Sequence, residues 1–195
     1  MCGDQELIDI VTQAVLGGVT IVQLREKNLD NSHFVAIAKR LKKKLEQHRV
    51  PLIINDNIDV ALEIGARGVH IGQQDMSLIQ ARKILKSDYI IGVSVSSVDE
   101  AILAEKHGAD YIAVSPIWAT PTKLDTPPQV GLEGVRKIRA VVKIPIVGIG
   151  NIKYNNAKQV IQAGCDGAAV VSAIMKADDP LMAAKKLIEV IHEEE

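Results

Sequence analysis

The stretch Lys106-His-Gly-Ala-Asp-Tyr-Ile-Ala-Val114 joins the end of an amphipathic helix to a glycine turn and a short apolar strand. The first glycine suits a helix C-cap, where left-handed backbone is needed. The same arrangement recurs three times, at residues 15–22, 63–71 and 162–171. Further apolar segments lie between these copies, at residues 50–54, 89–93 and 144–147. Interleaved, the two sets predict seven strands that alternate with helices.

The spacing of the predicted strands favours a (β/α)₈ TIM barrel, which needs roughly 20–28 residues per unit. A doubly wound sheet shares this alternation and is the structural alternative. The chain opens in a helical pattern at residues 6–16 instead of in a strand. We therefore expect a barrel that lacks its first strand in this chain, as a single domain over residues 1–195.

The composition sets limits on function. The 195 residues carry a net charge of −1, which does not favour nucleic acid or anionic membrane surfaces as partners. Aromatic residues are only 3% of the chain, so the core must be built from aliphatic side chains, as in buried parallel strands. We see no signal peptide and no apolar run of the ~20 residues that a transmembrane helix needs. A cytoplasmic location is expected.

The most informative polar segment is Gln23-Leu-Arg-Glu-Lys27, which follows the apolar run Val19-Thr-Ile-Val22. Side chains alternate faces along a strand, so Gln23, Arg25 and Lys27 are predicted to point one way. An amide and two cations at the carboxyl end of a parallel strand form an anion site, where barrels bind their ligands. The alternative is an exposed charged loop.

Acidic residues follow the next two predicted strands. Asp56 comes after residues 50–54, and Asp75 lies in the segment Gly72-Gln-Gln-Asp75. Two carboxylates at neighbouring strand ends suit Mg²⁺, with Arg25, Lys27 and Lys123 neutralising a diphosphate. For each aspartate alone, a helix N-cap is the competing interpretation.

A second anion site is indicated after the last two predicted strands. Gly148, Gly150 and the glycines at 164 and 167 allow close backbone approach, and residues 172–176 suit a short helix. Barrels often bind phosphate at this place. His70 lies within an apolar strand and is interpreted as a hydrogen-bonded core histidine, and Cys165 as a small turn residue.

Seven short motifs together resemble the thiamine phosphate synthase family, from about residue 4 to the C-terminus. The motifs are Gln23-x-Arg-Glu-Lys27, Asn55-Asp56, His70-Ile-Gly-Gln-x-Asp75, Gly92-Val-Ser94, Thr120-x-Thr-Lys123, Val147-Gly-Ile-Gly150 and Val171-Ser172. The resemblance implies a Mg²⁺-dependent transferase of the alkyl/aryl type. It would couple hydroxymethylpyrimidine diphosphate to a carboxylated thiazole phosphate through a dissociative mechanism, in which a pyrimidine cation forms as diphosphate leaves.

The resemblance also implies roles for individual residues. The residues that would bind the pyrimidine diphosphate are Gln23, Arg25, Lys27, Asn55, Ser94 and Lys123. Those that would bind the thiazole phosphate are Thr120, Thr122, Asn151, Val171 and Ser172. Asp56 and Asp75 would hold Mg²⁺. Four of these, Arg25, Lys27, Ser94 and Lys123, would take part in catalysis.

The chain departs from the family pattern at two positions besides the first strand. Asn151 stands where the family commonly has glycine, and Ser96 stands where it often has histidine. The alternatives are a thiazole tautomerase-like paralogue, which needs no Mg²⁺ carboxylate pair, and a non-catalytic barrel that binds phosphorylated ligands. The oligomeric state, monomer or homo-oligomer, stays open.

Overall fold

The computed structural model describes residues 3–27, 29–119 and 128–193. Its framework is one parallel sheet of seven strands in the order of the chain. The strands are β1 (Val22–Leu24), β2 (Leu52–Asn55), β3 (Gly68–Ile71), β4 (Ile90–Val95), β5 (Tyr111–Val114), β6 (Ile146–Ile149) and β7 (Gly167–Ala169). The predicted number and order of strands are confirmed, and the doubly wound alternative is wrong, because strand order in such a sheet reverses.

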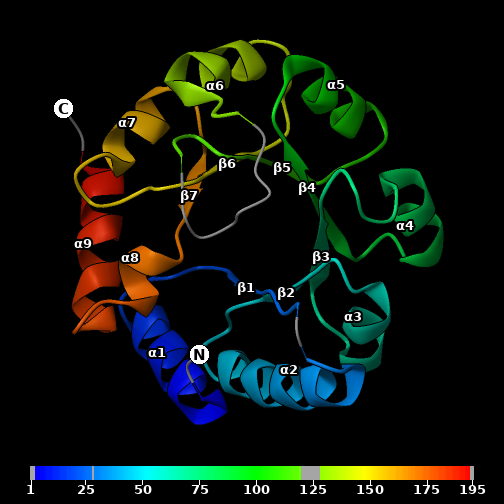
Figure 1. Ribbon diagram of the computed structural model, residues 1–195, viewed down its shortest axis with the longest axis vertical. Coiled ribbons are helices and arrows are strands. Elements are labelled where there is room, and N and C mark those ends of the chain that lie inside the picture. Colours follow the sequence, from blue (N-terminus) through cyan, green and yellow to red (C-terminus); the bar gives the residue numbers. More distant parts are fainter. Residues whose placement is uncertain (1–2, 28, 120–127, 194–195) are drawn as a thin grey trace.

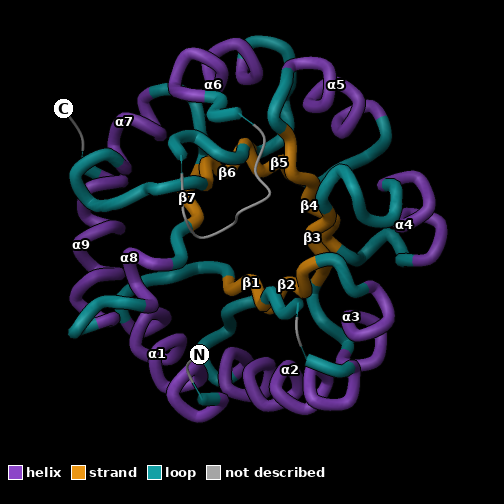
Figure 2. The backbone as a smooth tube through the Cα atoms, in the orientation of Figure 1, coloured by secondary structure: helices purple, strands orange, loops and turns teal. Residues whose placement is uncertain are grey.

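The sheet curves into an incomplete ring with the helices outside it (Figures 1 and 2). Each strand pairs with the next one, from β1 with β2 to β6 with β7. Within the described residues, β1 and β7 form the two edges of the sheet. The fold therefore resembles a TIM barrel with one strand position missing, while an eighth strand is not among the described elements.

Helices connect the strands and surround them. They are α1 (Asp4–Leu16), α2 (Asn31–Glu46), α3 (Ile58–Ile64), α4 (Leu78–Ile84), α5 (Val98–Lys106), α6 (Gly131–Arg139), α7 (Ala157–Gln162), α8 (Ser172–Met175) and α9 (Pro180–His192). Several begin where a side-chain oxygen accepts a backbone N–H, as Asp30 does for α2 and Ser97 for α5. No described helix is long and apolar enough to cross a membrane.

The first and last helices close the outer ring where the sheet is open. Figure 1 shows α1 beside α9, and the two helices pack against each other extensively. The contact is close at Gly17, where an added Cβ would lie 2.5 Å from the Leu181 carbonyl oxygen and 2.7 Å from the Ala184 Cβ. The helical layer is therefore continuous across the gap between β7 and β1.

The main hydrophobic core lies between the strands and the helices. Alternate strand residues belong to it, such as Ile54, Val69, Ile91 and Ile112, each fully buried. The intervening residues face the inside of the ring, because side chains alternate along a strand. This alternation places several polar side chains inside the barrel.

Two predicted strand boundaries are wrong. The run Val19–Val22 was expected to form the strand before Gln23, but β1 begins only at Val22, because only Val22–Leu24 pair with β2. Strand eight of the predicted barrel was expected to reach Val171, but β7 ends at Ala169 and Val171 is the N-cap of α8. In both places an apolar β-branched run continues beyond the pairing.

Candidate functional site

The candidate site lies at the carboxyl ends of β1 to β4. In β1, Val22 and Leu24 are buried and Gln23 is exposed, as the alternation predicted. Arg25 and Lys27 follow and are exposed. The Lys27 Nζ forms an ion pair with Asp56, which follows β2. Lys27 is therefore joined to the neighbouring strand end, and Arg25 lies beside it in the sequence.

Neither Asp56 nor Asp75 is a helix cap, so that competing interpretation is wrong. The cap of α3 is Asn57, whose side chain accepts from the Val60 N–H at 3.0 Å. The cap of α4 is Ser77, which accepts from the Gln80 N–H. Asp75 Oδ2 instead accepts from the Gly72 N–H at 2.8 Å.

Asp56 is held in a left-handed backbone conformation, with φ of 63°. Its N–H donates to the His70 carbonyl oxygen at 2.8 Å, which ties the end of β2 to β3. A left-handed non-glycine residue costs free energy and is often found at functional sites. The geometry turns the Asp56 carboxyl toward the strand ends instead of toward the helix that follows.

The two carboxyl groups are hydrogen-bonding neighbours. Burial raises the pKa of Asp56 above its usual value, and the Asp75 carboxyl raises it further. The Lys27 ammonium opposes both effects. The pair therefore holds more negative charge in one place than the single contacting cation offsets.

This pair fits the donor set that Mg²⁺ uses. Mg²⁺ is usually held by one or two carboxylates together with substrate phosphate and water. The described residues contain no group of three or more His, Cys, Asp or Glu residues that could hold a metal ion. Asp56 and Asp75 are two carboxylates and form no such group, and their role as Mg²⁺ ligands stays a prediction from the sequence.

A line of hydrogen-bonded side chains crosses the inside of the barrel below these carboxyl groups. His70 on β3 contacts the Ser94 Oγ through Nε2 at 2.8 Å and the Tyr111 hydroxyl through Nδ1 at 2.9 Å. The Tyr111 hydroxyl also hydrogen-bonds with the Gln23 side chain. Burial raises the pKa of Tyr111, so this phenol is neutral at physiological pH. The line connects β1, β5, β3 and β4.

The glycine at position 92 makes this line possible. Gly92 on β4 pairs with His70 on one side and Tyr111 on the other. A Cβ at Gly92 would overlap the Tyr111 ring. Because that space is empty of a side chain, the ring reaches over β4 to His70, with 5.6 Å between the ring centroids.

Asn55 and Ser94 complete the described part of this site. Asn55 ends β2 and is 9% exposed. Ser94 is half-buried on β4, and its carbonyl oxygen accepts from the Gln73 Nε2 at 2.7 Å. His70, 5% exposed, is the hydrogen-bonded core histidine that was expected. The sequence did not single out Tyr111, and Gln73 was quoted within a motif but was given no role.

The missed residues carried weak signals. Tyr111 stands in an apolar strand, where it is an ordinary core residue, and its reach to His70 depends on strand register. The line of hydrogen-bonded side chains is identified by four positions whose side-chain direction is toward the inside of the barrel: His70, Gly92, Ser94 and Tyr111. This pattern appears only when the three strands β3, β4 and β5 are aligned with one another.

The residues predicted for the second anion site also lie at neighbouring strand ends. Ile149 pairs with Ala169, so Asn151 and Val171 each follow two residues beyond a paired position. Asn151 has φ of 52°, the left-handed conformation expected where the family commonly has glycine. Val171 and Ser172 are exposed at the start of α8, the short helix predicted there. Thr120, Thr122 and Lys123 lie outside the described residues.

Comparison with known proteins connects this arrangement to one family. The family model described as thiamine monophosphate synthase matches residues 1–174. A thiamine-phosphate synthase from Albidiferax ferrireducens is 50% identical over 189 residues, covering 97% of this chain and 86% of the relative. A thiamine-phosphate synthase from Syntrophomonas wolfei is 46% identical, covering 94% and 88%.

A solved structure has the same fold. The thiamine phosphate pyrophosphorylase from Pyrococcus furiosus superimposes with a TM-score of 0.87 at 38% identity. The match covers 94% of this chain and 88% of that structure. Sequence and fold therefore point to the same group of proteins.

Proposed function

The chain belongs to the thiamine monophosphate synthase family, and from that membership we propose that it makes thiamine phosphate from a pyrimidine diphosphate and a thiazole phosphate. The observation that carries the proposal is the meeting of Lys27, Asp56 and Asp75 at one mouth of the barrel. Paired carboxylates suit Mg²⁺, which usually takes one or two of them together with substrate phosphate, and a neighbouring cation suits the diphosphate.

We assign the pyrimidine diphosphate to the mouth formed by β1 to β4. Arg25 and Lys27 would neutralise the diphosphate, Arg by a forked contact and Lys by a point contact. Asn55, Gln23 and Ser94 line the same mouth and offer hydrogen bonds to the rest of the substrate. Lys123 is assigned to the diphosphate by family resemblance alone.

Asp56 and Asp75 are the residues that would hold Mg²⁺. The ion, when bound, would stabilise negative charge on the departing diphosphate. It would also relieve the crowding of the two carboxylates, which raises the pKa of Asp56. Dependence on Mg²⁺ is thus part of the proposal.

The chemistry needs no protein nucleophile. The C–O bond between the pyrimidine methylene and the diphosphate breaks, and both electrons leave with the diphosphate. The thiazole nitrogen then donates its lone pair to the methylene carbon and forms the new C–N bond. Arg25, Lys27 and Lys123 would stabilise the leaving group, while the barrel holds the nitrogen in line and limits water.

The second phosphate belongs, in this proposal, at the ends of β6 and β7. Asn151, Val171 and Ser172 lie at those adjacent strand ends, and Thr120 and Thr122 join them by resemblance.

We also infer that β1 to β7 occupy seven positions of an eight-position barrel, with the remaining position between β7 and β1. We further propose a cytoplasmic location, which suits an enzyme with charged small-molecule substrates.

The direct test is a coupling assay. Incubating the chain with both half-substrates and Mg²⁺ should yield thiamine phosphate and diphosphate in equal amounts. Isomerised thiazole without coupling would instead support a tautomerase, and ligand binding without product would support a binding protein. Either result would refute synthase activity.

Asp75→Ala tests the metal assignment. Losing one of two Mg²⁺ ligands should lower kcat/KM by a factor of about 10² to 10³. The matched control is Asp59→Ala, an exposed carboxylate in the first turn of α3. If Asp75→Ala is folded and as active as Asp59→Ala, Asp75 does not hold the catalytic ion.

A further inference from the structure

A repeated carboxylate clamp fastens the opposite, amino-terminal face of the barrel. Asp110 Oδ2 accepts from the Ile91 N–H at 2.7 Å and from Arg82 at 2.6 Å. Asp166 Oδ2 likewise accepts from the Ile146 N–H at 2.8 Å and also contacts Arg139 at 3.1 Å. Each clamp joins the start of one strand, the residue before the next strand, and an arginine of the preceding helix.

A third copy of this backbone arrangement lacks the carboxylate. In each clamp the aspartate also donates its backbone N–H to the carbonyl oxygen of the strand residue that its side chain holds. Asp110 donates to Ile91 at 2.9 Å, and Asp166 donates to Ile146 at 2.8 Å. Arg67 donates to the Leu52 carbonyl oxygen in the same way, at 3.0 Å. The turn before it, Gly65-Ala66, corresponds to Gly108-Ala109 and Gly164-Cys165. An arginine therefore stands where the other two copies have an aspartate.

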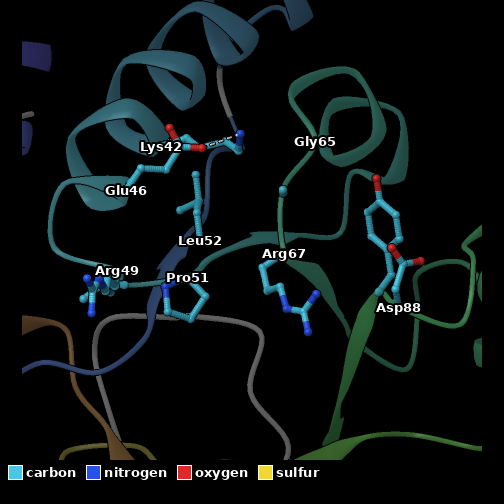
Figure 3. A pocket seen from close by; sticks show the side chains of 11 residues that line it. Lys42, Glu46, Arg49, Pro51, Leu52, Gly65, Arg67 and Asp88 are labelled. Atoms are coloured by element: carbon cyan, nitrogen blue, oxygen red, sulfur yellow. Dashed lines mark ion pairs between the residues drawn. The ribbon is translucent and has the colours of Figure 1, made fainter.

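A cavity of about 640 Å³ opens at this third copy. Its lining includes Arg49, Leu52 and Arg67, together with Tyr89. Figure 3 shows the Arg49 and Arg67 side chains on the two sides of Pro51, with Asp88 beyond Arg67. The volume falls in the range of small-molecule sites, about 300–1,000 Å³. It lies at the strand starts, away from the candidate active site.

The charge of this cavity is incompletely balanced. Lys42 is paired with Glu46 at 2.8 Å. Among the residues that the structure describes, neither Arg49 nor Arg67 forms an ion pair or a side-chain hydrogen bond. Asp88 is the remaining carboxylate of the lining. Two arginines thus face the cavity without a bonded anion.

The ends of α2 and α3 point carbonyl groups toward this face, which disfavours an anion there. The two complete clamps show that the fold tolerates one nonetheless. Each holds a carboxylate at the corresponding position with a single arginine. The third copy offers two arginines and the same strand amide position, so it is the better equipped of the three.

We propose that this cavity is a second binding site, which takes a phosphate monoester with a compact apolar part. Its phosphate fills the position of the missing carboxylate, beside Arg49, Arg67 and the Leu52 N–H. A doubly charged phosphate suits two arginines better than a carboxylate does. The apolar part of the ligand rests on Pro51 and Tyr89.

The test is an amide NMR titration of the full chain with inorganic phosphate and then with phenyl phosphate. Each ligand should shift the amides of Leu52, Ala66 and Arg67, and in each titration the three amides should report the same affinity. Phenyl phosphate should bind about tenfold more tightly, because its ring buries apolar surface. Equal affinities would overturn the apolar subsite. Shifts confined to residues near Lys27 and Asp56 would overturn the site itself.

Arg67→Asp restores the carboxylate of the other clamps. It should weaken phosphate binding at this face by about tenfold or more while keeping the protein folded. Lys185→Asp, at an exposed position of α9, makes the same charge change and should leave the shifts at Leu52 intact. Arg49→Asn, which suits the left-handed backbone there (φ of 59°), provides a second variant. Unchanged binding in both cavity variants would refute the proposal.

Discussion

At the scale of single residues, the two carboxyl groups of the candidate metal site are held together at a cost. Burial and the neighbouring Asp75 raise the pKa of Asp56 above its usual value of 3.8. Between the usual pKa and the raised pKa, the Asp56 carboxyl of the folded chain binds its proton more tightly than that of the unfolded chain does. Stability is therefore lost as the pH rises from the usual value through the raised pKa.

Asp56→Asn should relieve this cost in the metal-free protein. Asparagine keeps the shape and tolerates the left-handed backbone of position 56. With EDTA present, we expect the variant to melt above the wild type at about pH 7.5, and the difference to be smaller at about pH 4.5, because less of the wild-type carboxyl is charged at the lower pH. Thermal unfolding at both pH values measures this.

The same variant reports on metal binding. A ligand that binds only the folded chain raises its melting temperature. Added Mg²⁺ should raise that of the wild type, and Asp56→Asn should lose this rise. A wild type that melts at the same temperature with Mg²⁺ and with EDTA would contradict the assignment of Asp56 and Asp75.

The hydroxyl of Tyr111 connects two other polar groups of the site. Tyr111→Phe removes the hydroxyl partner of the His70 Nδ1 and of Gln23. We expect a loss of about 1–3 kcal/mol in the free energy of unfolding, because a buried polar group loses its partner. Urea unfolding checks the loss. A cost no greater than that of an exposed Tyr154→Phe control would mean that the line contributes nothing.

At the scale of elements, β4 and β5 depend on a glycine opposite an aromatic ring. Gly92→Ala would drive a Cβ into the Tyr111 ring, and overpacking of this kind costs about 1–3 kcal/mol. Gly167→Ala, on β7, meets no atom within 4 Å and serves as the control. In the Tyr111→Ala background, Gly92→Ala should cost much less. If Gly92→Ala costs the same free energy of unfolding in the wild type and in the Tyr111→Ala background, the Tyr111 ring does not pack against Gly92.

Much of this element level could be predicted from the sequence. Four copies of the helix, glycine and strand pattern and the three apolar segments between them predicted seven strands in the right order, because a short apolar run marks each strand. Strand ends were less predictable, as Val19 and Val171 show, since pairing decides where a strand ends. The line from Gln23 to Ser94 requires the register of four strands, which no local pattern contains.

The candidate site likewise has a part that local sequence predicts and a part that needs the structure. Asp56 follows β2 directly, and Lys27 and Asp75 follow the ends of β1 and β3 within a few residues, so parallel pairing brings all three to one edge of the sheet. The competing role of Asp56 and Asp75 as helix caps was excluded only by the structure, in which Asn57 and Ser77 cap the helices instead. A side-chain oxygen near a predicted helix start has two uses, and sequence alone does not separate them.

At the scale of the whole molecule, the outer layer is continuous where the sheet is open. The edges of the sheet are β1 and β7, and α1 lies against α9 across this opening (Figure 1). Gly17, the C-cap of α1, lies close to α9 in that contact. Its φ of −80° is open to any residue, so a side chain there would be opposed by packing alone.

Gly17→Ala should therefore loosen the closure of the barrel. The added Cβ meets the Leu181 carbonyl oxygen at 2.5 Å and the Ala184 Cβ at 2.7 Å, and α9 must shift to accommodate it. We expect a loss of about 1–3 kcal/mol in the free energy of unfolding. Faster hydrogen exchange should appear at the edge strands β1 and β7 and not at the central β4, because only the edges adjoin the opening. Leu16→Ala, a neighbouring position that is 58% exposed, is the control and should change stability by less than about 0.5 kcal/mol. Equal stability of Gly17→Ala and the control, or exchange that rises uniformly over all strands, would show that the contact between α1 and α9 does not hold the ring closed.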